Sequence, residues 1–252
     1  MEGRIVIVTG GGQGLGRAFA KGFAEQGDIV VIAEINGDNA RNVEAEILQA
    51  GGKALAIRTD VADPVSVRTM VQQVLTEYRR IDVLINNAAL LQSISRVPVD
   101  EISDEEWEQV LKVNVTGAFN CVKAVAGTMR EAKWGRIINL SSDTVLLPPP
   151  ITYAHYITSK AALVGMTRAL ARELGPDGIT VNAIMPGSTE TESNQDNKLT
   201  HANRMKDVVP RQCIPRIEVA DDLIGAAVFL ASEEAAFITG QSLPVNGGIA
   251  FV

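Results

Sequence analysis

The stretch that decides the fold is residues 5–16, Ile5-Val6-Ile7-Val8-Thr9-Gly10-Gly11-Gly12-Gln13-Gly14-Leu15-Gly16. Its β-branched start predicts a buried strand, its glycines predict a tight turn, and the residues from Gly14 onward predict the start of a helix. Glycines let the backbone approach a pyrophosphate closely, and the free N–H groups and dipole of a helix N-terminus stabilise its negative charge. The spacing is T-G-x-x-x-G-x-G and not the common G-x-G-x-x-G, and such a turn can also simply connect two elements. We predict that Gly10, Gln13, Gly14, Leu15 and Gly16 bind a dinucleotide cofactor.

A carboxylate follows at the end of the second predicted strand, where Ile32-Ala33 runs into Glu34, 18 positions after Gly16. An acid at about this position binds the adenosine ribose hydroxyls in dinucleotide-binding folds. The same charge repels a 2′-phosphate, and Gln13 supplies no cation inside the turn, so NAD is favoured over NADP. Arg17 weakens this argument, and an ordinary solvated loop acid is the alternative interpretation of Glu34.

Short β-branched runs alternate with longer amphipathic stretches along the rest of the chain. Seven strands are predicted, over residues 4–8, 29–33, 54–58, 83–85, 136–140, 180–184 and 242–245. Helical periodicity covers residues 14–26, 39–50, 64–78, 104–129, 153–174 and 220–231. This β-α-β-α order predicts an α/β fold, namely a Rossmann-like, doubly wound, seven-stranded parallel sheet with helices on both faces. Residues 1–252 show no linker or repeat and are expected to form a single domain, in which the polar segment 187–212 is expected to be a substrate lid.

The composition is typical of a globular protein, because 252 residues with 46% hydrophobic and 21% charged side chains exclude disorder and fibre. The net charge of −7 and the lack of a basic run argue against nucleic acid as a partner. No apolar stretch approaches the roughly 18 residues of a membrane helix and no signal peptide precedes the first strand, so we expect a cytoplasmic protein without membrane partners. Cys121 and Cys213 stand far apart, which indicates neither a disulfide framework nor a metal site. The sequence has no G-x-S-x-G motif, which argues against a serine hydrolase.

A phenol and an ammonium group are predicted to share one helix face, in Tyr156-Ile157-Thr158-Ser159-Lys160. Tyrosine, with a reference pKa near 10, is a poor base at neutral pH, but a cation within about 4 to 6 Å favours the phenolate and lowers that pKa. Tyr153 is an internal control, because four residues further on it meets Ile157 and no cation. The pattern predicts that Tyr156 is an acid/base residue assisted by Lys160.

Several motifs, taken in order, resemble the classical short-chain dehydrogenase/reductase family over essentially the whole chain. They are Thr9 to Gly16, Asp60-Val61, Asn86-Asn87-Ala88-Ala89, Asn114, Ser142, Tyr156 with Lys160, Pro186-Gly187, Phe237-Ile238-Thr239-Gly240-Gln241 and Val245-Asn246-Gly247-Gly248. The resemblance implies a nicotinamide-dependent oxidoreductase and a homotetramer. It implies that Tyr156 is the acid/base, that Lys160 lowers its pKa and holds the nicotinamide ribose, that Ser142 binds the substrate oxygen, and that Asn114 supports a proton-relay water. The other implied cofactor contacts are Asp60 and Val61 at the adenine, Asn87 and Ala88 on the adenosine side, and Pro186, Gly187, Thr189 and Thr191, the two threonines at the nicotinamide amide.

Three positions depart from the family pattern: Ala89 and Asn246 replace a usual Gly and Asp, and one extra position separates Ser142 from Tyr156. The extra position leaves Ser141 and Asp143 as alternatives to Ser142, which counting forward from Gly135 favours. The stretches 134–140, 153–156 and 214–216 are similar to enzymes that oxidise aryl secondary alcohols of the 1-phenylethanol type. A small hydrophobic substrate is therefore expected, against an apolar wall of Leu90, Leu91, Val145, Leu146, Leu147 and Pro148 to Pro150. A sugar, steroid or acyl-thioester carbonyl remains an alternative, as do an isomerase or dehydratase and a non-catalytic NAD-binding regulator.

Overall fold

A computed structural model describes residues 3–149, 153–194 and 198–252, and seven parallel strands form one sheet in this part of the chain. The strands are β1 (Ile5–Thr9), β2 (Ile29–Glu34), β3 (Lys53–Arg58), β4 (Val83–Asn86), β5 (Gly135–Leu140), β6 (Ile179–Pro186) and β7 (Ser242–Val245). Their order across the sheet is β3-β2-β1-β4-β5-β6-β7. β1 pairs residue by residue with β2, from Ile5 opposite Ile29 to Thr9 opposite Ala33. The predicted seven-stranded parallel sheet is therefore confirmed.

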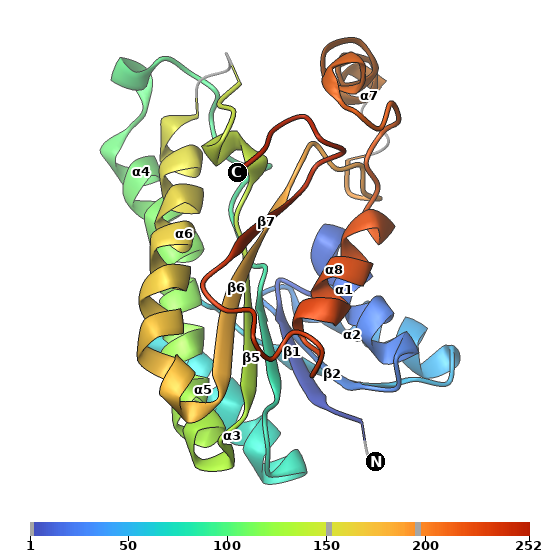
Figure 1. Ribbon diagram of the computed structural model, residues 1–252, viewed down its shortest axis with the longest axis vertical. Helices are drawn as coiled ribbons and strands as arrows, with labels where there is room; N and C mark the ends of the chain where they lie inside the picture. The colour runs from blue at the N-terminus through green and yellow to red at the C-terminus, as the bar shows by residue number, and fades with distance from the viewer. Residues whose placement is uncertain (1–2, 150–152, 195–197) are drawn as a thin grey trace.

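Helices cover both faces of the sheet, as expected for a doubly wound fold (Figure 1). One layer contains α3 (Pro64–Tyr78), α4 (Asp104–Leu111), α5 (Gly117–Ala132) and α6 (Ala154–Leu174), and the other contains α1 (Gly14–Glu25), α2 (Gly37–Gln49) and α8 (Asp221–Leu230). The short helix α7 (Lys198–Asn203) lies beyond the carboxyl ends of the strands. Short 3-10 turns occupy Val99–Glu101, Asp143–Val145, Gly175–Asp177 and Val209–Arg211, and π-helical turns occupy Lys112–Thr116 and Arg204–Val208. No helix among the described residues is long and apolar enough to cross a membrane.

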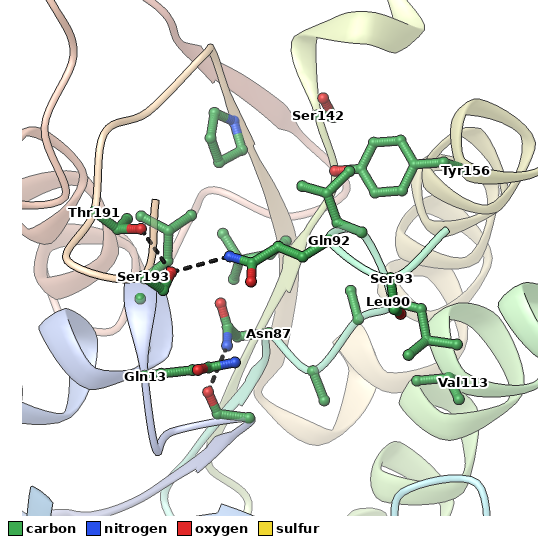
Figure 2. A pocket seen from close by; sticks show the side chains of 18 of the residues that line it. Gln13, Asn87, Leu90, Gln92, Ser93, Val113, Ser142, Tyr156, Thr191 and Ser193 are labelled. Carbon is green, nitrogen blue, oxygen red and sulfur yellow. Dashed lines mark hydrogen bonds between the residues drawn. The ribbon is translucent and has the colours of Figure 1, made fainter. Parts of the chain in front are cut away.

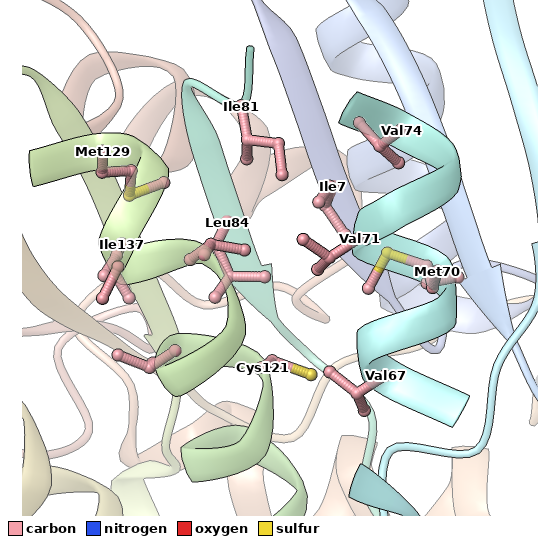
Figure 3. Close-up of a cluster of buried hydrophobic side chains, with 14 of the residues drawn as sticks. Ile7, Val67, Met70, Val71, Val74, Ile81, Leu84, Cys121, Met129 and Ile137 are labelled. Atoms are coloured by element: carbon pink, nitrogen blue, oxygen red, sulfur yellow. The ribbon is translucent and has the colours of Figure 1, made fainter. Parts of the chain in front are cut away.

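Strands β1 to β6 contribute side chains to two hydrophobic cores, because successive residues of a strand point to opposite faces of the sheet. On β1, Ile5 and Ile7 belong to the core under α3 and α5, whereas Val6 and Val8 belong to the core under α1, α2 and α8. Figure 3 shows Ile7 and Leu84 between α3 and α5. A strand that is buried on both faces needs a continuous apolar run, which is why these strands were recognisable in the sequence.

The strand order reverses between β1 and β4, which is where an open α/β sheet forms a crevice at its carboxyl ends. Thr9 ties these two ends together: its Oγ1 donates to the Ile85 carbonyl oxygen (3.2 Å) and accepts from the backbone N–H groups of Asn87 (3.0 Å) and Ala88 (3.1 Å). The crevice thus has a fixed floor formed by the two segments that carry the glycine-rich turn and the Asn-Asn-Ala-Ala motif.

Two segments differ from the sequence prediction. The single helical window at 104–129 is interrupted by the π-helical turn Lys112–Thr116, which separates α4 from α5. The expected lid at 187–212 has helical structure in its described part, α7 and the turns Arg204–Val208 and Val209–Arg211, together with a β-bridge between Glu190 and Val219. The sequence did not indicate this helix, because the segment is polar and α7 has only six residues, too few to show a periodic apolar face.

Candidate active site

A cavity of about 560 Å³ opens at the carboxyl ends of the strands and brings most of the predicted site residues together. The predicted residues that line it are Gly10, Gln13, Gly14, Leu15, Glu34, Asp60, Val61, Asn87, Ala88, Ser142, Tyr156, Lys160, Pro186, Gly187, Thr189 and Thr191. Gly16 and Asn114 are not among its lining residues. Figure 2 shows Gln13 and Asn87 on one side of this cavity and Ser142 and Tyr156 on the other. The cavity therefore joins the glycine-rich turn to the Tyr156 phenol.

The glycine-rich turn has the close backbone approach that a pyrophosphate site needs. Gly10 and Gly14 have positive φ angles of 62° and 56°, a conformation that glycine adopts without strain. A Cβ atom on Gly16 would lie 2.0 Å from the Gly10 carbonyl oxygen, so no larger residue fits inside the turn. The N–H of Gly14, at the start of α1, already donates to a carboxylate oxygen of Glu192, which lies six residues after β6 (2.7 Å). The turn thus binds an anionic group, which fits a pyrophosphate.

Glu34 lies at the other end of the cavity and is only 8% exposed. Its two carboxylate oxygens accept from the backbone N–H groups of Gly12 (3.2 Å) and Asn36 (3.0 Å), which fix the side chain beside the turn. Arg17, the cation that weakened the argument for NAD, forms an ion pair with Glu46 (2.6 Å). Its charge is therefore partly neutralised by α2, whereas the carboxylates of Glu34 and Asp60 line this end of the cavity.

Replacing Glu34 by alanine is expected to narrow the preference for NAD over NADP by about tenfold, because one charge repulsion and the ribose hydrogen bonds are lost. The ratio of kcat/KM values for the two cofactors measures this effect. Asp38→Ala, which removes an exposed acid from the first turn of the neighbouring α2, is the matched control and is expected to leave the ratio unchanged. A wild-type enzyme that already uses NADP better than NAD contradicts the assignment.

The predicted catalytic side chains meet where β5 ends and α6 begins. Ser142 follows β5, and Tyr156 and Lys160 lie one turn apart on α6, all three buried. The Lys160 Nζ donates to the Leu140 carbonyl oxygen (2.7 Å) and lies 5.6 Å from the centroid of the Tyr156 ring. Ser142 Oγ accepts from the N–H (3.2 Å) and the hydroxyl (2.9 Å) of Thr144, so its own proton is available for another acceptor.

Burial is the largest influence on the pKa of Tyr156. Burial raises the pKa of Tyr156 above its ordinary value, Tyr153 and Asp143 raise it further, and a hydrogen bond with Ser142 lowers it. Burial lowers the pKa of Lys160 to about 8. The predicted lowering of the Tyr156 pKa by Lys160 stays a prediction, and it would act against the larger effect of desolvating the phenolate. At neutral pH the phenol is protonated, which suits a proton donor.

Asn114 supports the site from outside the cavity. It lies in the π-helical turn between α4 and α5, and its Oδ1 accepts from the N–H of Leu90 (2.7 Å). Its Nδ2 donates to Ser159 Oγ (3.0 Å) and to the Leu90 carbonyl oxygen (3.3 Å). Asn114 thus joins α6, three residues after Tyr156, to the loop that follows β4. Such local π-helical turns occur frequently at functional sites.

The predicted apolar wall of the substrate end is wrong for the segment that follows Ser142. Leu90 and Leu91 line the cavity, but Val145, Leu146, Leu147, Pro148 and Pro149 are not among its lining residues, and Pro150 lies outside the described residues. The reason is a tight turn: the N–H groups of Leu146 and Leu147 donate to the Asp143 carbonyl oxygen (2.8 and 2.9 Å). The substrate end is instead lined by a mixture of side chains, namely Leu90, Leu91, Val113, Gln92, Ser93, Gln109, Ser193 and Asn194.

The segment expected to be a lid and the loop after β4 meet over this part of the cavity. The Gln92 Nε2 donates to the Ser193 Oγ (3.0 Å), and Ser193 in turn shares a hydrogen bond with Thr191 (2.9 Å), as Figure 2 shows. Three buried or half-buried charged residues near this end were not predicted as site residues: Asp143, Arg204 and Glu218. Each stands next to a turn or lid segment, where the sequence gives no periodic signal of burial.

The comparison with known proteins assigns the family. Residues 4–202 match the family described as "short chain dehydrogenase", and the chain belongs to this family of NAD(P)-dependent oxidoreductases. The chain is 37% identical over 252 residues to the "Probable galactose dehydrogenase GalD" of Rhizobium meliloti, covering 99% of this chain and 96% of that protein. It is 36% identical over 248 residues to the (2S)-[(R)-hydroxy(phenyl)methyl]succinyl-CoA dehydrogenase subunit BbsD of Thauera aromatica, covering 98% and 97%. A solved structure from Beutenbergia cavernae with NADP bound at low occupancy superposes with a TM-score of 0.86 at 35% identity, covering 99% and 97%.

Proposed function

We propose that this oxidoreductase interconverts a secondary alcohol and its ketone with NAD as the favoured cofactor. The observation that carries the proposal is the single cavity that connects Glu34 and the glycine-rich turn with Ser142 and Tyr156. A dinucleotide placed along it has its adenosine at Glu34 and Asp60, its pyrophosphate at the turn, and its nicotinamide between Lys160 and Thr189. Bound there, the nicotinamide supplies or accepts the hydride.

The side chains of the protein supply the proton chemistry at the substrate oxygen. In the direction of reduction, Ser142 donates a hydrogen bond to the carbonyl oxygen and Tyr156 donates its phenolic proton as the alcohol forms. In the direction of oxidation, Tyr156 accepts that proton from the alcohol. Lys160 holds the nicotinamide ribose with its buried ammonium group and stabilises negative charge that develops on the Tyr156 oxygen.

Two substrate classes are supported by different parts of the site. A hydrophobic, aryl secondary alcohol or ketone is favoured by Leu90, Leu91 and Val113, and the name of the Thauera aromatica relative contains a phenyl-bearing alcohol. A sugar or another hydroxyl-rich carbonyl compound is favoured by Gln92, Gln109 and Asn194, which add amide groups to the same end of the cavity. An acyl thioester is supported by the same Thauera aromatica relative, whose name also contains a succinyl-CoA group.

A panel of secondary alcohols and ketones, assayed with NAD and NADP by the absorbance of the reduced nicotinamide, tests the proposal. We expect stoichiometric conversion of the cofactor, with aryl ketones turned over faster than short aliphatic ones. Turnover of sugars with no turnover of aryl ketones selects the second substrate class. Product formed without a net change in absorbance indicates an isomerase or dehydratase, and cofactor binding without any product indicates a regulator.

We also propose that the chain forms a homotetramer in the cytoplasm. Large apolar side chains are exposed on α5, α8 and the edge strand β7, namely Phe119, Phe229 and Leu243. Contact with other copies of the chain would remove this apolar surface from water. Light scattering is expected to give four times the chain mass of 26.9 kDa, and a monomer in this measurement contradicts the proposal.

A further inference from the structure

A buried carboxylate outside the predicted site holds the segment at the nicotinamide end of the cavity. Glu218 lies three residues before α8 and is 5% exposed. Its Oε1 accepts from the Thr189 hydroxyl (2.6 Å), and its Oε2 accepts from the Gly187 N–H (3.2 Å), which also points to the Val245 carbonyl oxygen (3.2 Å). Gly187 and Thr189 both line the cavity, so Glu218 contacts it only through them.

A basic side chain holds the same segment from the lid. Arg204 is 6% exposed and donates to Ser188 Oγ (3.1 Å) and to the Thr189 carbonyl oxygen (2.7 Å). Residues 187–189 are therefore held by an acid and a base that come from two different segments. Any rotation of this segment breaks a hydrogen bond to a charged group, which is stronger than a neutral one.

The backbone of this segment is already hydrogen-bonded without the side chains of Glu218 and Arg204. The Glu190 N–H donates to the Glu218 carbonyl oxygen (2.7 Å), and Glu190 bridges Val219, so the backbone of this segment is already paired with the chain before α8. Burying two charged side chains in addition carries a large desolvation cost, which an apolar pair of the same size avoids. A cost of this kind is usual where a functional group must be fixed in place.

We propose that Glu218 is a positioning residue for the nicotinamide end of the cofactor, acting through Gly187 and Thr189. The inference rests on the proposed function, which places the nicotinamide amide against these residues. The carboxylate orients the Thr189 hydroxyl and the Gly187 backbone, and Arg204 fixes Ser188 and the Thr189 carbonyl oxygen. Glu218 therefore affects binding of the nicotinamide half of the cofactor and has no contact with the adenosine half.

The charge on Glu218 responds to pH in the neutral range. The charged groups that act on it are Arg204 and Arg216, which favour its ionised form, and Asp143 and Asp222, which oppose it. Burial raises the pKa of Glu218 to about 7. Above this pH both carboxylate oxygens accept hydrogen bonds, and as the pH falls through it one oxygen becomes protonated and loses its acceptor strength. Cofactor affinity is therefore expected to fall as the pH falls below about 7.

The test compares dinucleotides with ADP-ribose, which lacks the nicotinamide. Dissociation constants are measured by calorimetry at pH 7.5 and at pH 6 for the wild type, Glu218→Gln and Glu218→Ala. At pH 7.5 we expect Glu218→Ala to bind NADH about tenfold more weakly while its affinity for ADP-ribose stays within about twofold of wild type. Glu218→Gln keeps an acceptor oxygen, so it is expected to recover most of the NADH affinity and to show less change with pH than the wild type. Glu173→Ala, an exposed acid on α6, is the control and is expected to match the wild type.

The possible results separate the positioning role of Glu218 from the proposed dehydrogenase function. Equal loss of NADH and ADP-ribose binding in Glu218→Ala shows a general structural role and overturns the positioning role, as does unchanged NADH binding in both variants. If Glu218→Ala does not fold, as judged by circular dichroism, the pH dependence of the Glu218→Gln variant decides. A wild-type protein that binds ADP-ribose but gains no affinity from the nicotinamide contradicts the positioning role alone. A wild-type protein that binds no dinucleotide at all contradicts the proposed function as well.

Discussion

Tyr156→Phe is expected to lower kcat by at least about a hundredfold, which is the lower range for general acid–base catalysis. Phenylalanine keeps the buried ring but removes the only proton that Tyr156 can give to the substrate oxygen. Cofactor affinity is expected to stay near the wild-type value, because Lys160 remains and its Nζ still donates to Leu140. Steady-state kinetics measure the first effect, and fluorescence titration with NADH measures the second.

Tyr153 provides the matched control for this experiment. Its ring lies 5.5 Å from that of Tyr156, it is half-buried, and burial raises its pKa in the same direction. Tyr153→Phe removes an identical hydroxyl from the same end of α6, and we expect it to retain most of the activity. Loss of activity in Tyr153→Phe with retained activity in Tyr156→Phe would falsify the assignment of the acid/base.

Lys160→Ala is expected to lower kcat by about a hundredfold or more, because the buried Lys160 ammonium stabilises negative charge on the Tyr156 oxygen. It is also expected to weaken cofactor binding, because the same ammonium binds the ribose. The pH dependence gives a second readout. The Lys160 pKa of about 8 means that the group is charged below this pH and neutral above it. In the wild type, kcat/KM for reduction is therefore expected to fall as the pH rises through about 8.

This fall is expected to be absent from the residual activity of Lys160→Ala. Lys123→Ala, which removes an exposed ammonium from α5, is the control and is expected to retain the wild-type rate and pH profile. A Lys160→Ala variant that keeps the fall near pH 8 shows that another group titrates there. Unchanged cofactor affinity in the variant contradicts the role of Lys160 at the ribose.

The sheet could be predicted because its signals are local. The strands β1, β2, β4, β5 and β6 are short runs buried almost throughout, and the edge strand β7 was predicted over the same residues, Ser242–Val245. The glycine-rich turn could be recognised for the same reason, since its conformation depends on residues adjacent in sequence. Tyr156 was predicted from its spacing to Lys160 and Ser142 from the family resemblance, although the 13 residues between Ser142 and Tyr156 gave no information on the path of the loop.

The parts that were missed depend on contacts between distant segments. The Tyr156 pKa is raised because the phenol is enclosed by several segments, and a spacing rule that considers only Lys160 cannot include this desolvation. Val145 and Leu146 are apolar but do not line the cavity, because the path of the chain here depends on the turn at Asp143. Glu218 is 29 positions from its partner Thr189, and nothing near it in the sequence distinguishes it from a solvated acid.

The hydrogen bond between the Gly14 N–H and Glu192 makes cofactor entry an exchange of anions. A pyrophosphate that accepts from Gly14 releases the Glu192 carboxylate, so one negative group leaves the start of α1 as another arrives. Glu192 precedes Ser193, which closes over the cavity onto Gln92. Release of the carboxylate thus loosens the contact that lies across the substrate end. The expected consequence is an ordered kinetic mechanism, in which the dinucleotide enters first and the substrate second.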